Sequence, residues 1–365
     1  MQTSQATHVV VGISGGVDSA VAAALLKDQG LQVTGLFMKN WEEDDDAAYC
    51  GAAEDLAVAE TVCAQLGVRL HTVNFSHEYW ERVFAVFLRE YRAGRTPNPD
   101  VLCNKEIKFR EFLDYAKHLG ADAIATGHYA RRETRGGLPT LCKGVDQEKD
   151  QSYFLYSVSP EALSKTLFPL GQLTKTEVRQ QARDLGLQNS ERKDSTGICF
   201  IGERRFKDFL SRYLPNEPGR IETPEGAFIG EHDGLWFYTL GQRQGLDIGG
   251  PGEAWYVSGK DVARNVLEVV QGHNHPALMC KRLRAVEPEW LTGDLPTTPL
   301  TCNAKTRYRQ DDQSCIVKQA SHHTIDIEFQ MPQRAATPGQ ALVLYHEDRV
   351  LGGGTIDQID YPIDE

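Results

Sequence analysis

The first stretch of the chain that could do chemistry is the sequence Ser-Gly-Gly-Val-Asp-Ser at residues 14–19. It follows the apolar run 9–13, which predicts a buried parallel strand, and it precedes residues 20–27, whose alanines and leucines favour a helix. A glycine-rich turn between a strand and a helix binds anions, because the first amides of the helix have no partner within the helix. The hydroxyls of Ser14 and Ser19 can add donors. This stretch therefore predicts a phosphate-binding site.

The turn differs from the two commonest nucleotide-binding turns. It lacks the pattern G-x-x-x-x-G-K-S/T, so we expect no lysine against the terminal phosphates, and it lacks G-x-G-x-x-G. The pattern S-G-G-x-D-S instead resembles the PP-loop of ATP pyrophosphatases, which split ATP into AMP and pyrophosphate to activate a carbonyl or carboxyl oxygen. A plain glycine-rich connection in an α/β sheet is the alternative interpretation of these six residues.

Two of the eight cysteines have surroundings that favour a reactive thiol. Cys103 follows the proline-rich segment 94–100 and stands at the start of a helix expected from about residue 105, where the helix dipole would favour a thiolate. Cys199 has cationic neighbours on both sides, namely Arg192, Lys193, Arg204 and Arg205. Either residue alone could be structural. Beside an ATP-activating turn they indicate sulfur transfer, which needs one thiol to carry sulfur and another to cleave it from the carrier.

Two further residues could serve such a reaction. Asp100 lies three residues before the first of these cysteines, where its carboxylate could act as a general acid or base or could cap the following helix. Met38 lies at the end of an expected strand at 31–37, and ligands of doubly wound sheets bind at the carboxyl ends of strands. Met38 could therefore line a nucleobase pocket, although a lone methionine more often packs.

The elements that must position these residues follow an α/β pattern. Strands are expected at 8–13, 31–37, 68–75 and 121–126, and helices at 19–28, 54–66, 77–91 and 105–118. Repeated units of this kind indicate an α/β fold with a doubly wound parallel sheet. Past residue 213 short strands alternate with turns. We therefore expect a catalytic domain at 1–213, a small β-rich central domain at 214–274 and a C-terminal β-barrel at 275–365.

The composition bounds the function. The formal net charge of −12 over 365 residues, taken alone, argues against a nucleic-acid partner. Two segments are nevertheless basic, since 81–135 holds 11 Lys and Arg against 8 Asp and Glu, and 192–212 holds 6 against 3. No stretch resembles a signal peptide or a membrane span, and no C-x-x-C occurs, so we expect a cytoplasmic protein without a zinc knuckle. His273 and His275 have no third ligand nearby, and we predict no metal-ligating side chains.

Longer motifs extend over nearly the whole chain. They are GISGGVDS at 12–19, GLFMKNW at 35–41, GRTPNPDVLCNKEIKF at 94–109, ATGHY at 125–129, KDQSYFL at 149–155, DSTGICFIGER at 194–204, LGQR at 240–243, KTRYRQ at 305–310 and TPGQ at 337–340. With these motifs the chain resembles the bacterial tRNA-specific 2-thiouridylases, PP-loop enzymes that put sulfur on the wobble uridine of certain tRNAs. The segments around Cys103 and Cys199 are far more specific than the PP-loop, and no departure from the family pattern occurs at these positions.

The resemblance implies a role for each segment. ATP would adenylate the C2 oxygen of uracil with release of pyrophosphate, and a persulfide on Cys199 would deliver its terminal sulfur to C2 as AMP leaves. Cys103 would attack that persulfide, leaving a disulfide between the two cysteines, and Asp100 would serve as the acid or base. The implied ATP-binding residues are Gly12, Ile13, Ser14, Gly15, Gly16, Val17, Asp18, Ser19, Met38 and Gly127. The implied contacts to the target base and the tRNA are Asn98, Pro99, Asp100, His128, Lys149, Asp150, Gln151, Arg307, Tyr308 and Gln340.

The resemblance further implies ATP and Mg²⁺ as cofactors. The expected partners are tRNA, contacted in its anticodon region, and a protein that donates persulfide sulfur; we expect a monomer with no membrane partner. Two other functions stay open. A PP-loop synthetase of the GMP or NAD type would use ammonia or an amine and would need no paired thiols. A non-catalytic nucleotide- or RNA-binding module would bind its ligand without releasing pyrophosphate.

Overall fold

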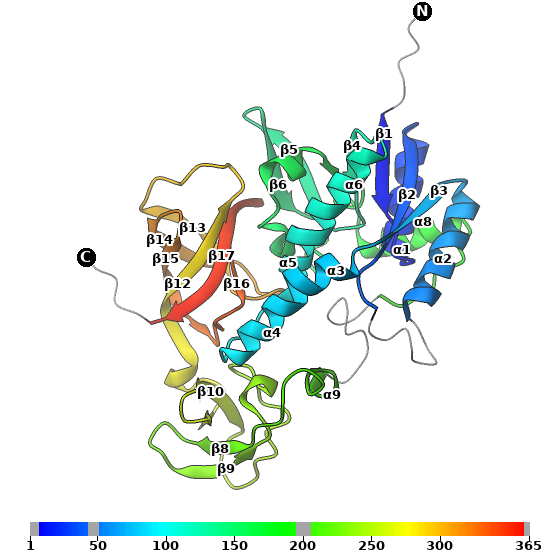
Figure 1. The fold of residues 1–365 in the computed structure, drawn as a ribbon. Helices are drawn as coiled ribbons and strands as arrows, with labels where there is room; N and C mark the ends of the chain where they lie inside the picture. The colour runs from blue at the N-terminus through cyan, green and yellow to red at the C-terminus, as the bar shows by residue number, and fades with distance from the viewer. Residues whose placement is uncertain (1–6, 43–50, 195–205, 361–365) are drawn as a thin grey trace, which may run out of the picture.

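A computed structural model describes residues 7–42, 51–194 and 206–360 of the chain (Figure 1). These residues form a parallel α/β layer, a small β domain and a β-barrel, which confirms the predicted fold class. In Figure 1 a group of helices lies between the parallel sheet and the barrel, and the small β domain lies below it. Among the helices that the structure describes, none combines the length and the apolar character that crossing a bilayer requires.

The parallel sheet has the strand order β3-β2-β1-β4-β7. Its strands are β1 (His8–Gly12), β2 (Gln32–Lys39), β3 (Arg69–Asn74), β4 (Ala123–Ala125) and β7 (Thr166–Leu167). Val9 and Val11 of β1 pack into one hydrophobic cluster and Val10 packs into another, because both faces of the sheet are covered. The chain moves from β1 to β2 on one side and later to β4 on the other. The turn after β1 therefore lies where the strand order reverses, which is the usual ligand site of such sheets.

Helices α1 (Val17–Asp28) and α2 (Gly51–Leu66) cover one face of this sheet, and α8 (Lys175–Asp184) packs against α1. Helix α8 begins with a capping box, in which the backbone N–H of Glu177 donates to Thr174 Oγ1 at 3.3 Å and Thr174 N–H donates to Glu177 Oε2 at 2.7 Å. Val178 and Ala182 of α8 belong to the same hydrophobic cluster as Ala20 of α1. This packing brings the first residue of α8 to the PP-loop.

Two continuous helical segments cover the other face. The first comprises α3 (Ser76–Tyr79), the π-helical η1 (Trp80–Phe84) and α4 (Ala85–Arg92), and the second comprises α5 (Pro99–Cys103), the π-helical η2 (Asn104–Glu111) and α6 (Phe112–His118). The helix expected from residue 105 thus begins at Pro99, and that boundary was wrong. Asn98 caps it, since its side chain accepts from Val101 N–H at 3.3 Å, and Pro99 takes the first helical position, where a missing N–H costs nothing.

Shorter elements join the α/β layer to the β domains. They are the hairpin strands β5 (Ala130–Arg135) and β6 (Leu138–Lys143), the 3-10 helix η3 (Ser152–Leu155), α7 (Pro160–Ser164) and α9 (Phe206–Leu210). The small β domain has the strand order β10-β11-β8-β9. Its elements are β8 (Gly219–Glu222), β9 (Phe228–His232), η4 (Leu235–Phe237), β10 (Trp255–Asp261) and β11 (Val266–Gln271).

The small β domain carries a lysine on its inward face. Lys260 of β10 lies opposite Leu267 of β11, which is fully buried in the core of this domain. The ammonium nitrogen is buried and makes no hydrogen bond with any residue in the described ranges. Burial lowers the pKa of Lys260 from 10.5 to about 8. The folded domain therefore holds an unfavourable charge at neutral pH.

We predict that Lys260→Met stabilises the protein at pH 7. Between pH 8 and 10.5 the unfolded chain binds more protons at this position than the folded one, so the stability of the wild type should rise over that interval. Below pH 8 the substitution should raise the free energy of unfolding by about 3 kcal/mol, and this gain should vanish above pH 10.5. Denaturant titrations at several pH values measure both quantities. Replacement of the exposed Lys165 by Met is the matched control, and an equal gain there would contradict the assignment.

The C-terminal barrel has the strand order β12-β15-β14-β13-β16-β17 and closes through pairing of β12 with β17. Its elements are η5 (Pro276–Leu278), β12 (Met279–Trp290), β13 (Leu300–Lys305), β14 (Gln313–Ala320), β15 (Thr324–Arg334), β16 (Ala341–His346) and β17 (Arg349–Ile359). The barrel interior is apolar, with Leu283, Ile327 and Leu344 among its fully buried residues. It is thus a packed core, and its ligands must bind outside it.

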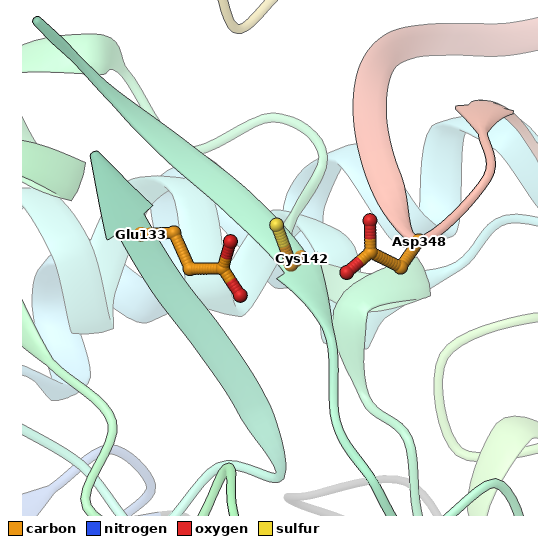
Figure 2. A group of neighbouring side chains, drawn as sticks. All are labelled: Glu133, Cys142 and Asp348. Atoms are coloured by element: carbon orange, nitrogen blue, oxygen red, sulfur yellow. The ribbon is translucent and has the colours of Figure 1, made fainter. Parts of the chain in front are cut away.

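The barrel joins the α/β layer through the β5–β6 hairpin, where Arg349 of β17 pairs with Cys142 of β6. Figure 2 shows Glu133, Cys142 and Asp348 facing one another. Their potential ligand atoms all lie within 4.8 Å of one another. Two arginines already neutralise these carboxylates, since Arg131 bonds Asp348 at 2.5 Å and Arg135 bonds Glu133 at 2.8 Å. Burial raises the pKa of the Cys142 thiol to about 11, with Asp348 and Glu133 adding to the effect. We interpret the cluster as an ion-pair network between domains.

Candidate active site

The PP-loop forms a tight turn whose hydroxyl groups brace it. Ser19 Oγ accepts from the backbone N–H of Ser14 at 3.2 Å and donates to the carbonyl of Gly16 at 3.1 Å. Gly15 has φ +78°, and a Cβ at this position would lie 2.7 Å from the carbonyl oxygen of Asp55. Gly15 must therefore be glycine. The turn leads directly into α1 and presents the N-terminal end of that helix to an anion.

The other residues expected to bind ATP lie around the same end of β1. A Cβ on Gly127, in the loop after β4, would lie 2.9 Å from the backbone nitrogen of Ser19. A Cβ on Gly12, the last residue of β1, would lie 3.4 Å both from Met38 Cε and from the ring of Phe112. Met38 therefore lies beside Gly12 as the carboxyl-end argument predicts, while it also packs against the neighbouring core. The structure brings these expected residues together at one edge of the sheet.

A charged network that the sequence analysis missed lies beside the PP-loop. Lys175, the first residue of α8, donates to the two carboxylate oxygens of Asp18 at 2.8 and 2.9 Å and lies 2.7 Å from Asp194 Oδ1. Asp194 also contacts Lys149 at 2.8 Å and Arg179 at 2.7 Å. Asp18 and Lys149, which were expected at the site, are thus connected through Lys175 and Asp194, which were not expected there. The sequence from Thr174 to Glu177 has the pattern of a capping box and so indicates where α8 starts, but such a pattern does not show what the helix packs against.

Two groups in and beside this network, Asp194 and Tyr129, have shifted pKa values. Burial alone would raise the pKa of Asp194, but hydrogen bonds from Lys149 and Lys175 outweigh it and lower that pKa to about 2. Burial, together with the charge of Asp18, raises the pKa of the Tyr129 hydroxyl, which donates to Asp18 Oδ1 at 2.8 Å. At neutral pH Asp194 is therefore ionised and Tyr129 is a neutral donor. The ammonium group of Lys175 lies beside Asp18 of the PP-loop, and that of Lys149 is connected to it through Asp194.

The residues expected at the target base occupy α5 and its cap. Asn98 is the cap, Pro99 and Asp100 form the first turn, and Cys103 ends the helix. Asp100 is half-buried, whereas Cys103 is fully buried in the hydrophobic cluster that also contains Phe112. Cys103 thus stands beyond the first turn of the helix, so the helix-dipole argument for its reactivity does not hold at this position. The next residue, Asn104, donates to the Phe154 carbonyl at 3.0 Å and ties this helix to η3.

Two other expected contact residues, His128 and Asp150, are engaged within the protein. His128 is buried against Phe109, and burial, reinforced by the charge of Lys108, holds its pKa well below the usual range. Asp150 accepts from the backbone N–H groups of Gly144 and Ser152 at 3.0 and 3.1 Å, and burial raises its pKa. The two hydrogen bonds to Asp150 shape the segment that follows the hairpin.

Two of the expected tRNA contacts of the barrel, Arg307 and Tyr308, lie on the loop between β13 and β14, whereas Gln340 lies between β15 and β16. Arg307 is exposed. The ring of Tyr308 packs against Phe154 of η3, with ring centroids 4.5 Å apart, and its other neighbours include Arg309 at 5.5 Å. This loop therefore contacts the same short helix that Asn104 holds. Gln151, the residue before η3, accepts from the Tyr129 N–H through its side chain at 3.0 Å.

Cys199, the expected persulfide carrier, lies outside the residues that the structure describes. The chain leading to it is anchored up to Asp194. Arg179 donates to the carbonyl oxygens of Ser190 and Arg192, both at 3.1 Å, and Arg192 bonds Asp55 at 2.5 Å. Asn189 donates to the Gly15 carbonyl at 2.9 Å. The segment that leads to Cys199 thus leaves the described structure directly beside the PP-loop.

Comparison with family models divides the chain into three matched regions. Residues 7–203 match a tRNA methyl transferase HUP domain, residues 207–271 match a tRNA methyl transferase PRC-barrel domain, and residues 280–356 match an aminomethyltransferase β-barrel domain. A solved complex of a 4-thiouridine synthetase with RNA and bound ATP is similar over 56% of this chain and 49% of that chain, at 18% identity and a TM-score of 0.34.

Curated relatives match from end to end. A tRNA-specific 2-thiouridylase MnmA of Methylococcus capsulatus is 61% identical over 356 residues, which cover 96% of each chain. The protein of the same name from Legionella pneumophila (strain Lens) is 58% identical over 355 residues, covering 96% of this chain and 98% of the relative. At this identity and coverage the chain belongs to the family of tRNA-specific 2-thiouridylases.

Proposed function

We propose that this chain is an ATP-dependent sulfurtransferase that converts the wobble uridine of tRNA to 2-thiouridine. The observation that carries the proposal is a PP-loop with a paired cationic network at the end of β1, in a chain that is 61% identical to a 2-thiouridylase over nearly its full length. The loop can hold a triphosphate, and the helical segment that begins with α5 and Cys103 reaches the same sheet edge through Phe112 of α6. The family resemblance supplies the chemistry that connects ATP binding at the loop with the thiol of Cys103.

The proposed reaction has two stages. In the first, the C2 oxygen of uracil attacks the α-phosphorus of ATP, and pyrophosphate leaves. In the second, the terminal sulfur of the Cys199 persulfide attacks C2, and the Cys103 thiolate attacks the inner sulfur of Cys199. The persulfide S–S bond breaks, its electrons stay on the sulfur at C2, and AMP leaves as the C=S bond forms. The product enzyme carries a Cys103–Cys199 disulfide, which a thiol reductant returns to two thiols.

The described residues fit these needs. The N-terminal amides of α1 and the ammonium groups of Lys175 and Lys149 would bind the phosphates. Asp18 is a carboxylate at the phosphate site and could hold Mg²⁺ together with phosphate oxygens, as this ion usually binds through one or two carboxylates. Asp100, half-buried in the first turn of α5, would take the proton that the uracil ring loses when its C2 oxygen attacks. An external protein would supply the persulfide sulfur.

The proposal predicts cleavage of ATP between the α and β phosphates. ATP labelled in the α and γ positions should yield AMP and pyrophosphate, and only when unmodified tRNA is present, because the acceptor of the adenylyl group is the tRNA base. Thin-layer chromatography separates these products from ADP and orthophosphate. ADP as the main product would contradict the PP-loop assignment. Pyrophosphate release with ammonia in place of tRNA would favour a synthetase instead, and binding without any cleavage would favour a non-catalytic module.

A further inference from the structure

The proline-rich loop that leads into α5 is held by all three domains. Thr96 is only 8% exposed, and its backbone N–H donates to the carbonyl of Pro338 in the barrel at 2.9 Å. Its hydroxyl lies 3.4 Å from the hydroxyl of Thr239 in the small β domain. Asn98, two positions further, caps α5. The three domains thus meet immediately before the helix that carries Asp100 and Cys103.

Gln340 supplies two hydrogen bonds to this loop. Its Nε2 donates to the Thr96 carbonyl at 2.8 Å and to the Pro97 carbonyl at 3.2 Å. A loop with prolines at 97 and 99 lacks two backbone donors and cannot satisfy these carbonyls from its own chain. The backbone of Gln340 is itself fixed, since its N–H donates to Thr337 and its carbonyl accepts from Ile356 at 2.8 Å. The side chain is therefore presented from a rigid part of the barrel.

The neighbouring glycine permits this approach. Gly339 has φ +93°, and a Cβ at this position would lie 2.8 Å from the Thr96 carbonyl oxygen and 2.9 Å from the Thr96 nitrogen. The barrel backbone and the loop backbone are thus in direct contact, and any side chain at residue 339 would force them apart. Gly339 and Gln340 both contact the loop at Thr96. Gly339 lets the two backbones approach closely, and Gln340 donates hydrogen bonds to the loop.

We propose that Gln340 is a positioning residue for the thiolation reaction, which fixes the entry of α5 and hence the placement of Asp100 and Cys103. The chemical part of this inference rests on the proposed function, whereas the loop contact does not. The sequence analysis expected Gln340 to contact tRNA, but both hydrogen atoms of its amide are directed at the loop in this structure. Loss of a tRNA contact would raise the Kd for tRNA, whereas loss of a positioning residue would lower the rate at saturating tRNA.

The test compares Gln340→Ala and Gln340→Glu with wild type. The glutamate keeps the shape of the side chain but places a carboxylate against two carbonyl oxygens, so it should be at least as harmful as alanine. With the persulfide preloaded and tRNA saturating, the single-turnover rate should fall about 10- to 100-fold, while the Kd for tRNA should change less than about two-fold. Exposed Gln330→Ala on β15 is the matched control, and exposed Arg307→Ala is the variant expected to raise Kd instead.

Hydrogen exchange without tRNA or ATP provides a readout that does not depend on activity. The Thr96 amide should exchange faster in both Gln340 variants and in Gly339→Ala, with the melting temperature of the whole protein checked in parallel. A raised Kd with an unchanged rate at saturation would assign Gln340 to tRNA binding and overturn the proposal, as would unchanged exchange at Thr96. If wild type forms no 2-thiouridine, the proposed function fails, and the exchange result still decides whether Gln340 holds the loop.

Discussion

Replacing Cys199 by serine is expected to abolish 2-thiouridine formation while leaving adenylation of the tRNA intact. A serine hydroxyl cannot carry a persulfide sulfur, but the first stage of the proposed reaction uses ATP and the PP-loop and does not involve this thiol. The variant should therefore still release pyrophosphate when tRNA is added, in amounts close to one per active site. Quenched-flow measurement of pyrophosphate and mass spectrometry of digested tRNA give the two readouts on the same sample.

Cys103→Ser is the matched partner of this experiment. It should accept the persulfide on Cys199 and form the adenylated base, but it should stall because no thiol cleaves the carrier S–S bond. Peptide mapping of the wild type after one turnover without reductant should find a Cys103–Cys199 disulfide. Cys302 and Cys315 must be mapped as well, because their sulfurs lie 3.7 Å apart in the barrel and could oxidise together. Wild-type thiolation rates in both single variants would refute the two-thiol scheme.

Lys175→Met is expected to have the largest effect on the ATP half of the reaction. Lys175 contacts Asp18 and Asp194 with a side chain that is only 12% exposed, so its removal leaves two carboxylates facing the site of an anionic substrate. Loss of a preorganised charge of this kind costs about 10²- to 10³-fold in rate, and we expect kcat/KM for ATP to fall by that order. The KM for ATP should rise as well, because the lysine would contact the phosphates both in the bound substrate and in the transition state.

Lys175→Arg controls for charge and for folding. It keeps the positive charge between the two carboxylates, and it should retain a substantial part of the activity that methionine loses. The melting temperature of both variants shows whether the fold survives the loss of the ion pairs. An unchanged KM and rate in a folded Lys175→Met protein would mean that the network only holds α8 in place, and the phosphate role would have to be abandoned.

Local sequence patterns predicted the sheet well because its signals are local. The run Val9–Val11 is apolar at every position since both faces of β1 are covered, and the glycine-rich turn after it needs a positive φ at Gly15. The start of the second helical segment was harder to predict. Two prolines near residue 98 argue against a helix, yet Pro99 at the first helical position favours one, and the Asn98 cap decides the outcome.

Local patterns missed the parts of the site that depend on tertiary contacts. In the sequence, Lys175 is an ordinary lysine in the first turn of a helix. Only the packing of α8 on α1 brings it to Asp18, which lies 157 positions away. Gln340 was expected to contact tRNA because its motif matches that of the family. In the structure it contacts Thr96, 244 positions away in the sequence. Cys103 was expected at the start of a helix, but the helix begins at Pro99 and Cys103 lies fully buried in the core. No local pattern encodes such pairings.

The central claim, ATP-dependent thiolation of a tRNA base, is tested most directly by analysing the nucleosides of the product. Purified protein is incubated with ATP, Mg²⁺, a persulfide donor and unmodified tRNA, and the digested tRNA is examined by liquid chromatography and mass spectrometry. The account predicts 2-thiouridine at the wobble position, formed only when ATP and the donor are both present. A methylated nucleoside, or unmodified uridine despite ATP and tRNA binding, would contradict it.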